Sequence, residues 1–285
     1  MSTSRVVAHY SRGNVLESIT AALSAAGKSP ETVSSADLDA VDQFHLGGRA
    51  TATRLLSMLD LKPEHAVLDV GCGLGGPARC CAAEFATEGR VTGVDLTPEY
   101  VDAGNAMSSW VGATSRVSLL TGDALELASL VEPASFDAGY MLHVGMNIGD
   151  KRALAAATFG ALRPGGSFGL FDMMRGDVGA LAFPLPFATT AADAAVATPD
   201  EYRAAYADAG FELVKEELMG PACAQMIEGA IARAKAYAQE HGGPPPLGLQ
   251  HVMGPSLPQK MANGLGCFKD GSMTAWMMVF KKPES

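Results

Sequence analysis

The stretch Val67-Leu68-Asp69-Val70-Gly71-Cys72-Gly73-Leu74-Gly75-Gly76 decides the fold of this 285-residue chain. The apolar run before the glycines, residues 66–70, is typical of a buried parallel strand. The glycines predict a tight turn where the backbone comes close to a ligand, because glycine adopts positive φ and has no Cβ. The next apolar run ends on Asp95, 26 residues after Asp69. A carboxylate at that position can bind the hydroxyls of a ribose.

Strand-like and helix-like segments alternate on both sides of this loop. Strands are expected over residues 66–70, 90–95, 117–120, 136–141, 167–171, 211–217 and 274–281. Helices are expected between them, over residues 77–85, 98–110, 151–162 and 199–209. This alternation predicts an α/β fold with a seven-stranded, mostly parallel sheet and helices on both faces. A ligand would then bind beyond the carboxyl ends of the strands.

The segments that flank this pattern predict additional helical parts. Residues 1–47 are expected to form an N-terminal helical cap, and residues 48–217 the Rossmann-like core. Residues 218–272 hold two candidate helices and are expected to form a lid, because long insertions at a catalytic edge usually cover it. Residues 273–285 would return to the sheet as its last strand. A role of the insertion in packing or in a homodimer stays open as an alternative.

Composition and charge narrow the class of protein. The chain has 21 basic and 31 acidic residues, a formal net charge of −10, and nucleic-acid binders usually carry a basic surface instead. No apolar run approaches the roughly 20 residues that cross a bilayer, and residues 1–10 lack the apolar stretch of a signal peptide. We therefore expect no nucleic-acid partner, no membrane association and a cytoplasmic location. The five cysteines form no CxxC pair, and no metal is expected.

Several motifs in a fixed order resemble those of the class I S-adenosylmethionine (SAM)-dependent methyltransferases. They lie at residues 67–73, 94–95, 122–124, 136–137 and 162–166. Residues 44–48, 143–147 and 246–255 are similar to the small-molecule branch that includes the sarcosine/dimethylglycine and ubiquinone-pathway enzymes. The resemblance implies SAM as the cofactor, S-adenosylhomocysteine (SAH) as the product and a small molecule as the methyl acceptor.

The resemblance also implies roles for individual residues. Gly71 and Gly73 would lie against the amino acid part of SAM, Asp95 would bind the ribose, and Asp123 would bind the adenine. The full set of expected cofactor contacts is Tyr10, Asp69, Gly71, Gly73, Asp95, Leu96, Asp123, Ala124, Leu142 and His143. Acceptor contacts are expected from Met146, Asn147, Met173, Arg175 and His251, most of which directly follow a strand.

His143 is the best-placed titratable residue for the chemistry. Methyl transfer from a sulfonium is an in-line displacement that alignment alone can drive. A base is needed only if the acceptor must lose a proton, and a histidine base would make the rate rise with pH near neutrality. The sequence leaves two roles open for His143, as a base and as a positioning group.

The segments expected around the acceptor, residues 176–198 and 218–272, hold few charges and many apolar side chains. They favour a neutral, ring-bearing or amine acceptor, methylated on nitrogen or carbon rather than oxygen. A glycine- or sarcosine-type amino acid is the alternative acceptor, with Arg175 as the cation for its carboxylate. Two other classes stay open. One is a non-catalytic SAM-binding protein, and the other is an NAD(P)-dependent oxidoreductase, since the glycines also fit G-x-G-x-x-G.

Overall fold

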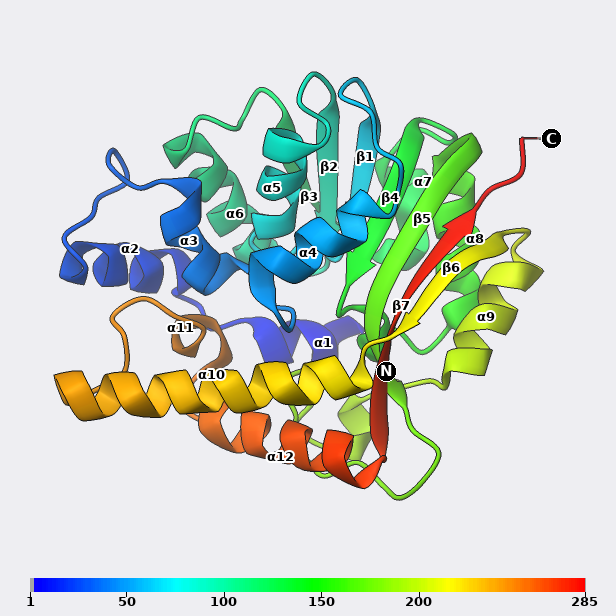
Figure 1. Cartoon of the computed structure of the whole chain (residues 1–285). Coiled ribbons are helices and arrows are strands. Elements are labelled where there is room, and N and C mark those ends of the chain that lie inside the picture. The colour runs from blue at the N-terminus through cyan, green and yellow to red at the C-terminus, as the bar shows by residue number, and fades with distance from the viewer. Residues whose placement is uncertain (1–2, 285) are drawn as a thin grey trace.

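The structure, a computed structural model, describes residues 3–284 and forms one central sheet between two layers of helices (Figure 1). The strands are β1 (Ala66–Val70), β2 (Arg90–Asp95), β3 (Val117–Thr121), β4 (Phe136–Leu142), β5 (Leu162–Arg175), β6 (Glu212–Leu218) and β7 (Met273–Lys281). Their order is β3-β2-β1-β4-β5-β7-β6, and β7 alone runs antiparallel to its neighbours β5 and β6. The prediction of a seven-stranded, mostly parallel sheet is confirmed.

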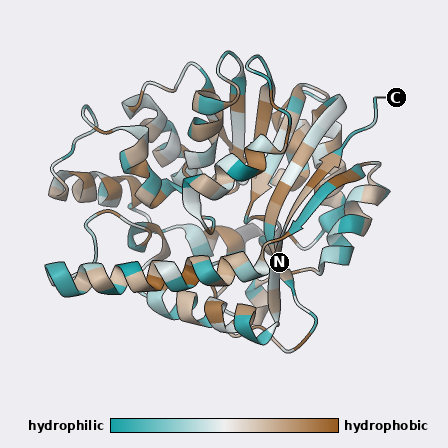
Figure 2. Cartoon of the chain, in the orientation of Figure 1, coloured by the Kyte–Doolittle hydropathy of each residue, from teal (hydrophilic) through white to brown (hydrophobic). Residues whose placement is uncertain are grey.

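Two hydrophobic cores hold the helices to the two faces of the sheet. One core joins the sheet to α4 (Gly48–Ser57), α5 (Gly76–Glu84) and α6 (Pro98–Trp110). The other joins it to α7 (Leu127–Leu130), α8 (Lys151–Ala161) and α9 (Pro199–Asp208). Full burial of one large apolar side chain stabilises the fold by about 1.5–3 kcal/mol. Figure 2 shows the same pattern, with hydrophobic residues concentrated in the central strands.

The turn after β1 requires glycine. Gly71 has φ 73°, and a Cβ at this position would lie 2.2 Å from a methyl carbon of Val144. Val144 belongs to the loop after β4, the neighbour of β1 in the sheet. The turns that follow the two adjacent strands therefore touch each other at the carboxyl edge.

Beyond this edge lie α1 (Thr3–Tyr10), α10 (Gly220–His241), α11 (Gln250–Met253) and α12 (Leu257–Asp270), whereas α2 (Val15–Ala25) packs against α6 and α3 (Ser35–Asp42) against α5. Figure 1 shows α10 and α12 running side by side across the lower end of the sheet, with α1 between them and the strands. Segments from both ends of the sequence thus cover the edge where the strands β1 to β5 end.

Strand β5 is longer than the sequence pattern predicts. It spans Leu162–Arg175, whereas the sequence pattern predicts a helix up to residue 162, a turn over residues 163–166 and a strand only over residues 167–171. The register between β4 and β5 shifts between Phe136 and Ala138, so the Arg163–Gly166 stretch forms an irregularity within the strand pair. Such a bulge leaves extra residues unpaired while the strand continues, which explains why proline and glycine are tolerated there.

Candidate active site

A cavity lies at the carboxyl edge of the sheet, under the helices that cover it. Its lining includes most of the residues that the sequence singles out, namely Tyr10, Gly71, Gly73, Asp95, Leu96, Asp123, Ala124, Leu142, His143, Met146, Asn147 and Met173. Parallel strands place the residues that follow them at one edge, which is why these distant positions meet. Asp69, Arg175 and His251 do not belong to the lining.

Asp95 connects two turns at one end of the cavity. Its Oδ2 accepts a hydrogen bond from the backbone N–H of Gly73 at 2.8 Å, and its Oδ1 accepts one from the N–H of Thr97 at 2.8 Å. Burial raises the pKa of Asp95 above its usual value. Each carboxylate oxygen can accept a further hydrogen bond. Asp95 can therefore hold the glycine loop and still receive the hydroxyls of a ribose.

Asp123 stands at the same end, just after β3. Its Oδ1 accepts a hydrogen bond from the N–H of Leu125 at 2.9 Å and so caps the short 3₁₀ turn Ala124–Glu126. This contact fixes both Asp123 and Ala124 at the cavity lining. A carboxylate and a backbone N–H at this position suit the amino group and ring nitrogen of a purine.

Asp69 lies behind the glycine loop and not in the cavity. It is 2% exposed, and its Oδ2 accepts a hydrogen bond from the hydroxyl of Tyr140 at 2.9 Å. Burial raises the pKa of Asp69 to about 7. Because side chains alternate along a strand, Asp69 points to the same face as Tyr140 of β4. The structure thus places Asp69 against Tyr140 and outside the cavity lining, in contrast to the expected cofactor contact.

His143 follows β4 in an unusual backbone conformation. Its φ is 56°, in the left-handed region, and its N–H donates to the carbonyl of Phe171 at 2.8 Å. This conformation costs on the order of 1 kcal/mol for a residue other than glycine, and such strain often occurs at functional sites. The ring packs 4.5 Å from the ring of Phe171 and 6.3 Å from that of His45, measured between centroids.

The imidazole of His143 is neutral at physiological pH. Burial, with a smaller contribution from His45, lowers the pKa of His143 well below its usual value. Of the two roles that the sequence leaves open, this environment favours a positioning group over a base with a pKa near neutrality. Among residues 3–284, no carboxylate offsets the loss of water that burial imposes on the charged ring.

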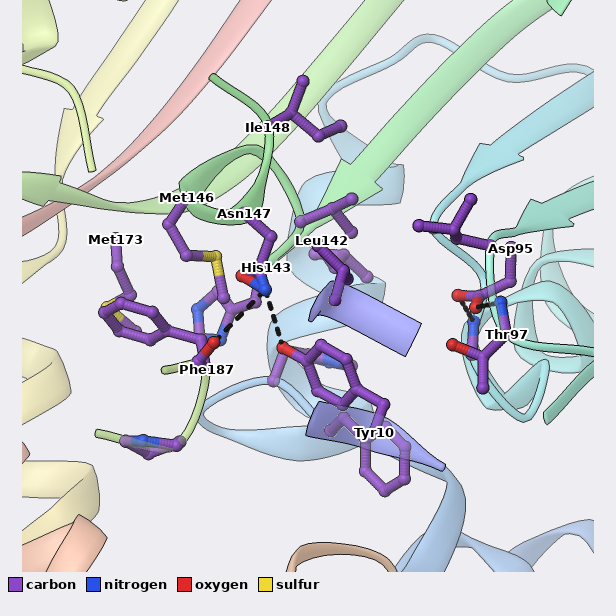
Figure 3. A pocket seen from close by; sticks show the side chains of 18 of the residues that line it. Tyr10, Asp95, Thr97, Leu142, His143, Met146, Asn147, Ile148, Met173 and Phe187 are labelled. Carbon is purple, nitrogen blue, oxygen red and sulfur yellow. Dashed lines mark hydrogen bonds between the residues drawn. The ribbon is translucent and has the colours of Figure 1, made fainter. Parts of the chain in front are cut away.

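Asn147 joins the loop after β4 to two parts of the cover. Its Nδ2 donates to the hydroxyl of Tyr10 on α1 at 3.2 Å and to the carbonyl of Phe187 at 3.2 Å (Figure 3). Phe187 belongs to the long segment between β5 and α9. The three residues line the same cavity. Asn147 therefore ties the loop after β4 to the two segments that cover this loop.

Lys151 is a residue that sequence reasoning missed. Its buried ammonium donates to the carbonyls of Gly145 at 2.8 Å and Ala195 at 2.7 Å, and also to that of Ile148. These contacts hold the loop that carries Met146 and Asn147. A lysine at the start of a helix usually indicates a solvated side chain, so the pattern gave no signal for this role.

The other end of the cavity is apolar. The insertion between β6 and β7 and the first residue of β7 contribute Ile227, Leu249, Met253, Met261, Phe268 and Met273 to the lining. Within residues 3–284, Asp95 and Asp123 are the only lining side chains that carry a formal charge, and no lysine or arginine lines the cavity. The part of the cavity away from these two carboxylates therefore suits a neutral ligand.

Arg175 and His251 lie away from the cavity. The Arg175 guanidinium makes one long hydrogen bond, of 3.4 Å, to the carbonyl of Val196. His251 shares a hydrogen bond of 2.8 Å with the hydroxyl of Ser18 and contacts the carbonyl of Pro246 at 2.7 Å, so it fastens α11 to α2. These contacts argue against the acceptor-binding roles expected for both residues.

Two properties concern residues 3–284 as a whole. No helix among them combines the length and apolarity needed to cross a bilayer. No group of three or more histidine, cysteine, aspartate or glutamate side chains in this range is arranged to hold a metal ion.

Comparison with known sequences places the family motif on the glycine loop and the strands beside it. Residues 67–166 match the family described as a methyltransferase domain. The 24-methylenesterol C-methyltransferase 2 of Oryza sativa subsp. japonica is 31% identical over 120 residues, which are 42% of this chain and 32% of that protein. The matched region thus spans about a third of the length of this curated relative.

Comparison with solved structures extends the likeness to most of the fold. The geranyl diphosphate C-methyltransferase from Streptomyces coelicolor A3(2), in complex with Mg²⁺, geranyl diphosphate and SAH, superimposes with a TM-score of 0.65. The two chains are 18% identical, and the match covers 82% of this chain and 80% of that one. The Haemonchus contortus phosphoethanolamine N-methyltransferase 2 gives a TM-score of 0.72 at 20% identity, covering 93% and 60%. At these identities the likeness concerns the fold.

Proposed function

We propose that this chain, whose residues 67–166 form a SAM-dependent methyltransferase domain of class I, methylates a small, neutral and largely apolar molecule. The observation that carries the proposal is the division of one cavity into two ends. Asp95 and Asp123 lie with the glycine loop at one end of the cavity. Apolar side chains from α10, α12, β7 and the stretch around α11 line the other end. This arrangement fits a polar nucleoside beside an uncharged acceptor.

The residues at the first end fit SAM. Gly71 and Gly73 leave space for a ligand close to the backbone, and Asp95 keeps acceptor capacity toward the cavity. When bound, SAM supplies an activated methyl group on its sulfonium. Leu142 ends β4, His143 follows it, and both line the cavity, where they would lie between the cofactor and the acceptor.

The chain's own contribution to catalysis is alignment and exclusion of water. Holding two reactants in line lowers the barrier without a change in their chemistry. The bonds from Asn147 to Tyr10 and Phe187 close the cavity over the reacting groups. A neutral His143 orients the acceptor, and its position also allows it to accept a proton from an acceptor that must lose one. Methylation of nitrogen or carbon is favoured, because such nucleophiles can react without a strong base.

An amino acid acceptor of the glycine or sarcosine type is disfavoured. Its carboxylate would require a cation, and neither Arg175 nor any other lysine or arginine of the described chain lines the cavity. An unpaired carboxylate in an apolar site costs several kcal/mol. The same argument disfavours phosphorylated acceptors, such as the geranyl diphosphate and phosphoethanolamine after which two of the similar proteins are named.

The test is transfer of a labelled methyl group. The purified chain is incubated with methyl-tritiated SAM and, in separate reactions, with neutral indoles and phenols, neutral or weakly basic amines, glycine and sarcosine. We expect tritium in the products of neutral compounds and none above background with glycine or sarcosine. NMR of the product locates the methyl group on nitrogen, carbon or oxygen. Tight SAM binding without transfer to any compound would instead favour a non-catalytic SAM-binding protein.

We also propose that residues 218–272 act as a lid and that residues 1–47 act as a cap over a core of residues 48–217, with 273–285 completing the sheet. The support is that α10, α11 and α12 cover the carboxyl edge and contribute to the cavity lining. Hydrogen exchange of residues 218–272 should slow when SAH and an acceptor bind together. Equal protection of this segment in the free protein and in the complex would assign it to structural packing.

A further inference from the structure

Two polar atoms in the cavity have no hydrogen-bond partner. Nε2 of His143 and Oδ1 of Asn147 are both buried, and neither meets a donor or acceptor within the described chain. Both residues line the cavity, and Figure 3 shows them on the other side of Leu142 from Asp95. Buried polar groups are hydrogen-bonded in the large majority of cases, and each exception requires an explanation.

The orientation of the Asn147 amide is fixed by its neighbours. The carbonyl oxygen of Phe187 can only accept a hydrogen bond, so the Asn147 atom that faces it at 3.2 Å must be the NH₂ group. The same NH₂ group also donates to the hydroxyl of Tyr10. Both donors of the amide are therefore engaged, and Oδ1 is left as an acceptor that cannot rotate away.

The donor and acceptor roles of the two unpaired atoms are therefore restricted. Oδ1 of Asn147 accepts only, whereas Nε2 of a neutral His143 donates or accepts according to its tautomer. No cation among the lining residues would attract an anionic group to this position. A ligand that satisfies both atoms must present a hydrogen to Asn147, and it must do so while the rest of its surface is apolar.

We infer that the methyl acceptor carries a neutral hydroxyl or N–H group on an apolar skeleton, and that Asn147 Oδ1 and His143 Nε2 recognise this group. The inference rests on the proposed function and adds the substrate class to it. Asn147 is thereby a specificity-determining residue, because an analogue without the hydrogen would leave its oxygen unpaired. A site built to hydrogen-bond one group discriminates strongly against a compound that lacks it.

The test uses pairs of compounds that differ only in this hydrogen. Indole and 1-methylindole, and 1-naphthol and 1-methoxynaphthalene, are titrated into the full chain saturated with SAH. For at least one pair, the member with the free N–H or O–H should bind at least about tenfold more tightly than its methylated partner. The two pairs separate a preference for N–H from a preference for O–H.

Two variants assign the effect to Asn147. Asn147→Leu keeps the size of the side chain and removes its oxygen, so the ratio of the two affinities within a pair should fall toward one. Asn263→Leu is the matched control, because it makes the same replacement at an asparagine outside the cavity lining and should leave the ratio as in the wild type. Affinity for SAH reports whether each variant is folded.

Several results would overturn the inference. Equal binding of both members of every pair to the wild type would do so without any variant, as would binding of no compound to the SAH complex. A ratio that stays unchanged in a folded Asn147→Leu protein would show that Asn147 has only a structural role. Failure of the wild type to bind SAH would contradict the proposed function itself, so the two failures are distinguishable.

Discussion

The two ends of the cavity are built in different ways. At the cofactor end, Asp95 is the last residue of β2 and Asp123 comes two residues after β3, and both accept hydrogen bonds from backbone groups within a few residues or in the adjacent turn. At the acceptor end, Asn147 joins residues 137 and 40 positions away, Tyr10 and Phe187. The first end is determined by local turns on neighbouring strands, and the second by the packing of distant segments. Substitutions at one end should therefore leave the other largely unaffected.

The largest difference between an effect on the rate of methyl transfer and an effect on SAM affinity is expected at His143. His143→Ala should lower the rate of methyl transfer by about 10²-fold, because loss of alignment at the reacting groups has effects of this size. SAM affinity should stay within about threefold of the wild type. His143→Asn should recover part of the rate, since asparagine tolerates the left-handed backbone and keeps hydrogen-bonding groups. Single-turnover kinetics with labelled SAM measures the rate.

The pH profile and a control refine this prediction. Because the pKa of His143 lies well below its usual value, the wild-type rate should show no histidine step between about pH 6 and 8. Arg175→Ala, at an exposed residue outside the lining, should change the rate less than about threefold. A wild-type rate in His143→Ala, or a clear step near pH 6.5 that this variant abolishes, would contradict the positioning role of a neutral ring.

The next effect concerns His45, a neutral residue beside the acceptor end. Burial lowers its pKa from 6.5 to about 4. Below pH 6.5 the unfolded chain binds a proton at this histidine and the folded chain does not, so stability is lost as the pH falls toward 4. The loss amounts to roughly 2–3 kcal/mol. Between pH 7 and pH 4.5, the free energy of urea unfolding of the wild type should fall by this amount relative to that of His45→Gln.

The comparison with His45→Gln is needed because other buried groups change the free energy of unfolding in the opposite direction as the pH falls. Burial raises the pKa of Asp42 and Asp172 to about 6 and that of Asp69 to about 7. These carboxyl groups favour the folded state as the pH falls, in both proteins alike. Parallel stability curves for wild type and variant would refute the assignment to His45.

A smaller effect is expected at the cofactor end. Asp95→Ala removes a carboxylate that would bind the ribose, and SAM affinity should fall by more than about tenfold, since each charge-assisted hydrogen bond contributes roughly 1.5–3 kcal/mol. Asp102→Ala is the control, because it removes an exposed carboxylate from the following helix α6. Calorimetry measures both. Equal SAM affinity in wild type and Asp95→Ala would remove the basis for the ribose assignment.

The difference between the two ends also explains what the sequence could predict. The strands, the glycine loop and the placement of Asp95 and Asp123 follow from local patterns, because a parallel sheet brings the ends of its strands together. The surroundings of Asp69 were not predicted, because they depend on a contact with a strand that is distant in the sequence. The sequence pattern could not show that the Asp69 carboxylate would accept a hydrogen bond from the phenol of Tyr140 on the neighbouring strand β4.

At the acceptor end, the sequence predicted the elements better than their contacts. The insertion and its two long helices were expected, yet His251 turned out to fasten α11 to α2, and Lys151 to hold the loop of Asn147. Such contacts depend on how segments far apart in the chain pack, which hydrophobic periodicity does not encode. The low pKa of His143 has the same origin, since burial depends on the assembled cover.

Titration of the wild-type chain with SAM, SAH and NADH in separate calorimetric experiments tests the central claim most directly. The glycine loop of Gly71 and Gly73 is compatible with both kinds of nucleotide-containing ligand, whereas Asp123 and the methyltransferase family match favour SAM. We predict that one molecule of SAM or SAH binds per chain and that NADH gives no heat of binding. Binding of NADH together with an absence of binding by SAM and SAH would contradict the assignment of this protein as a SAM-dependent methyltransferase.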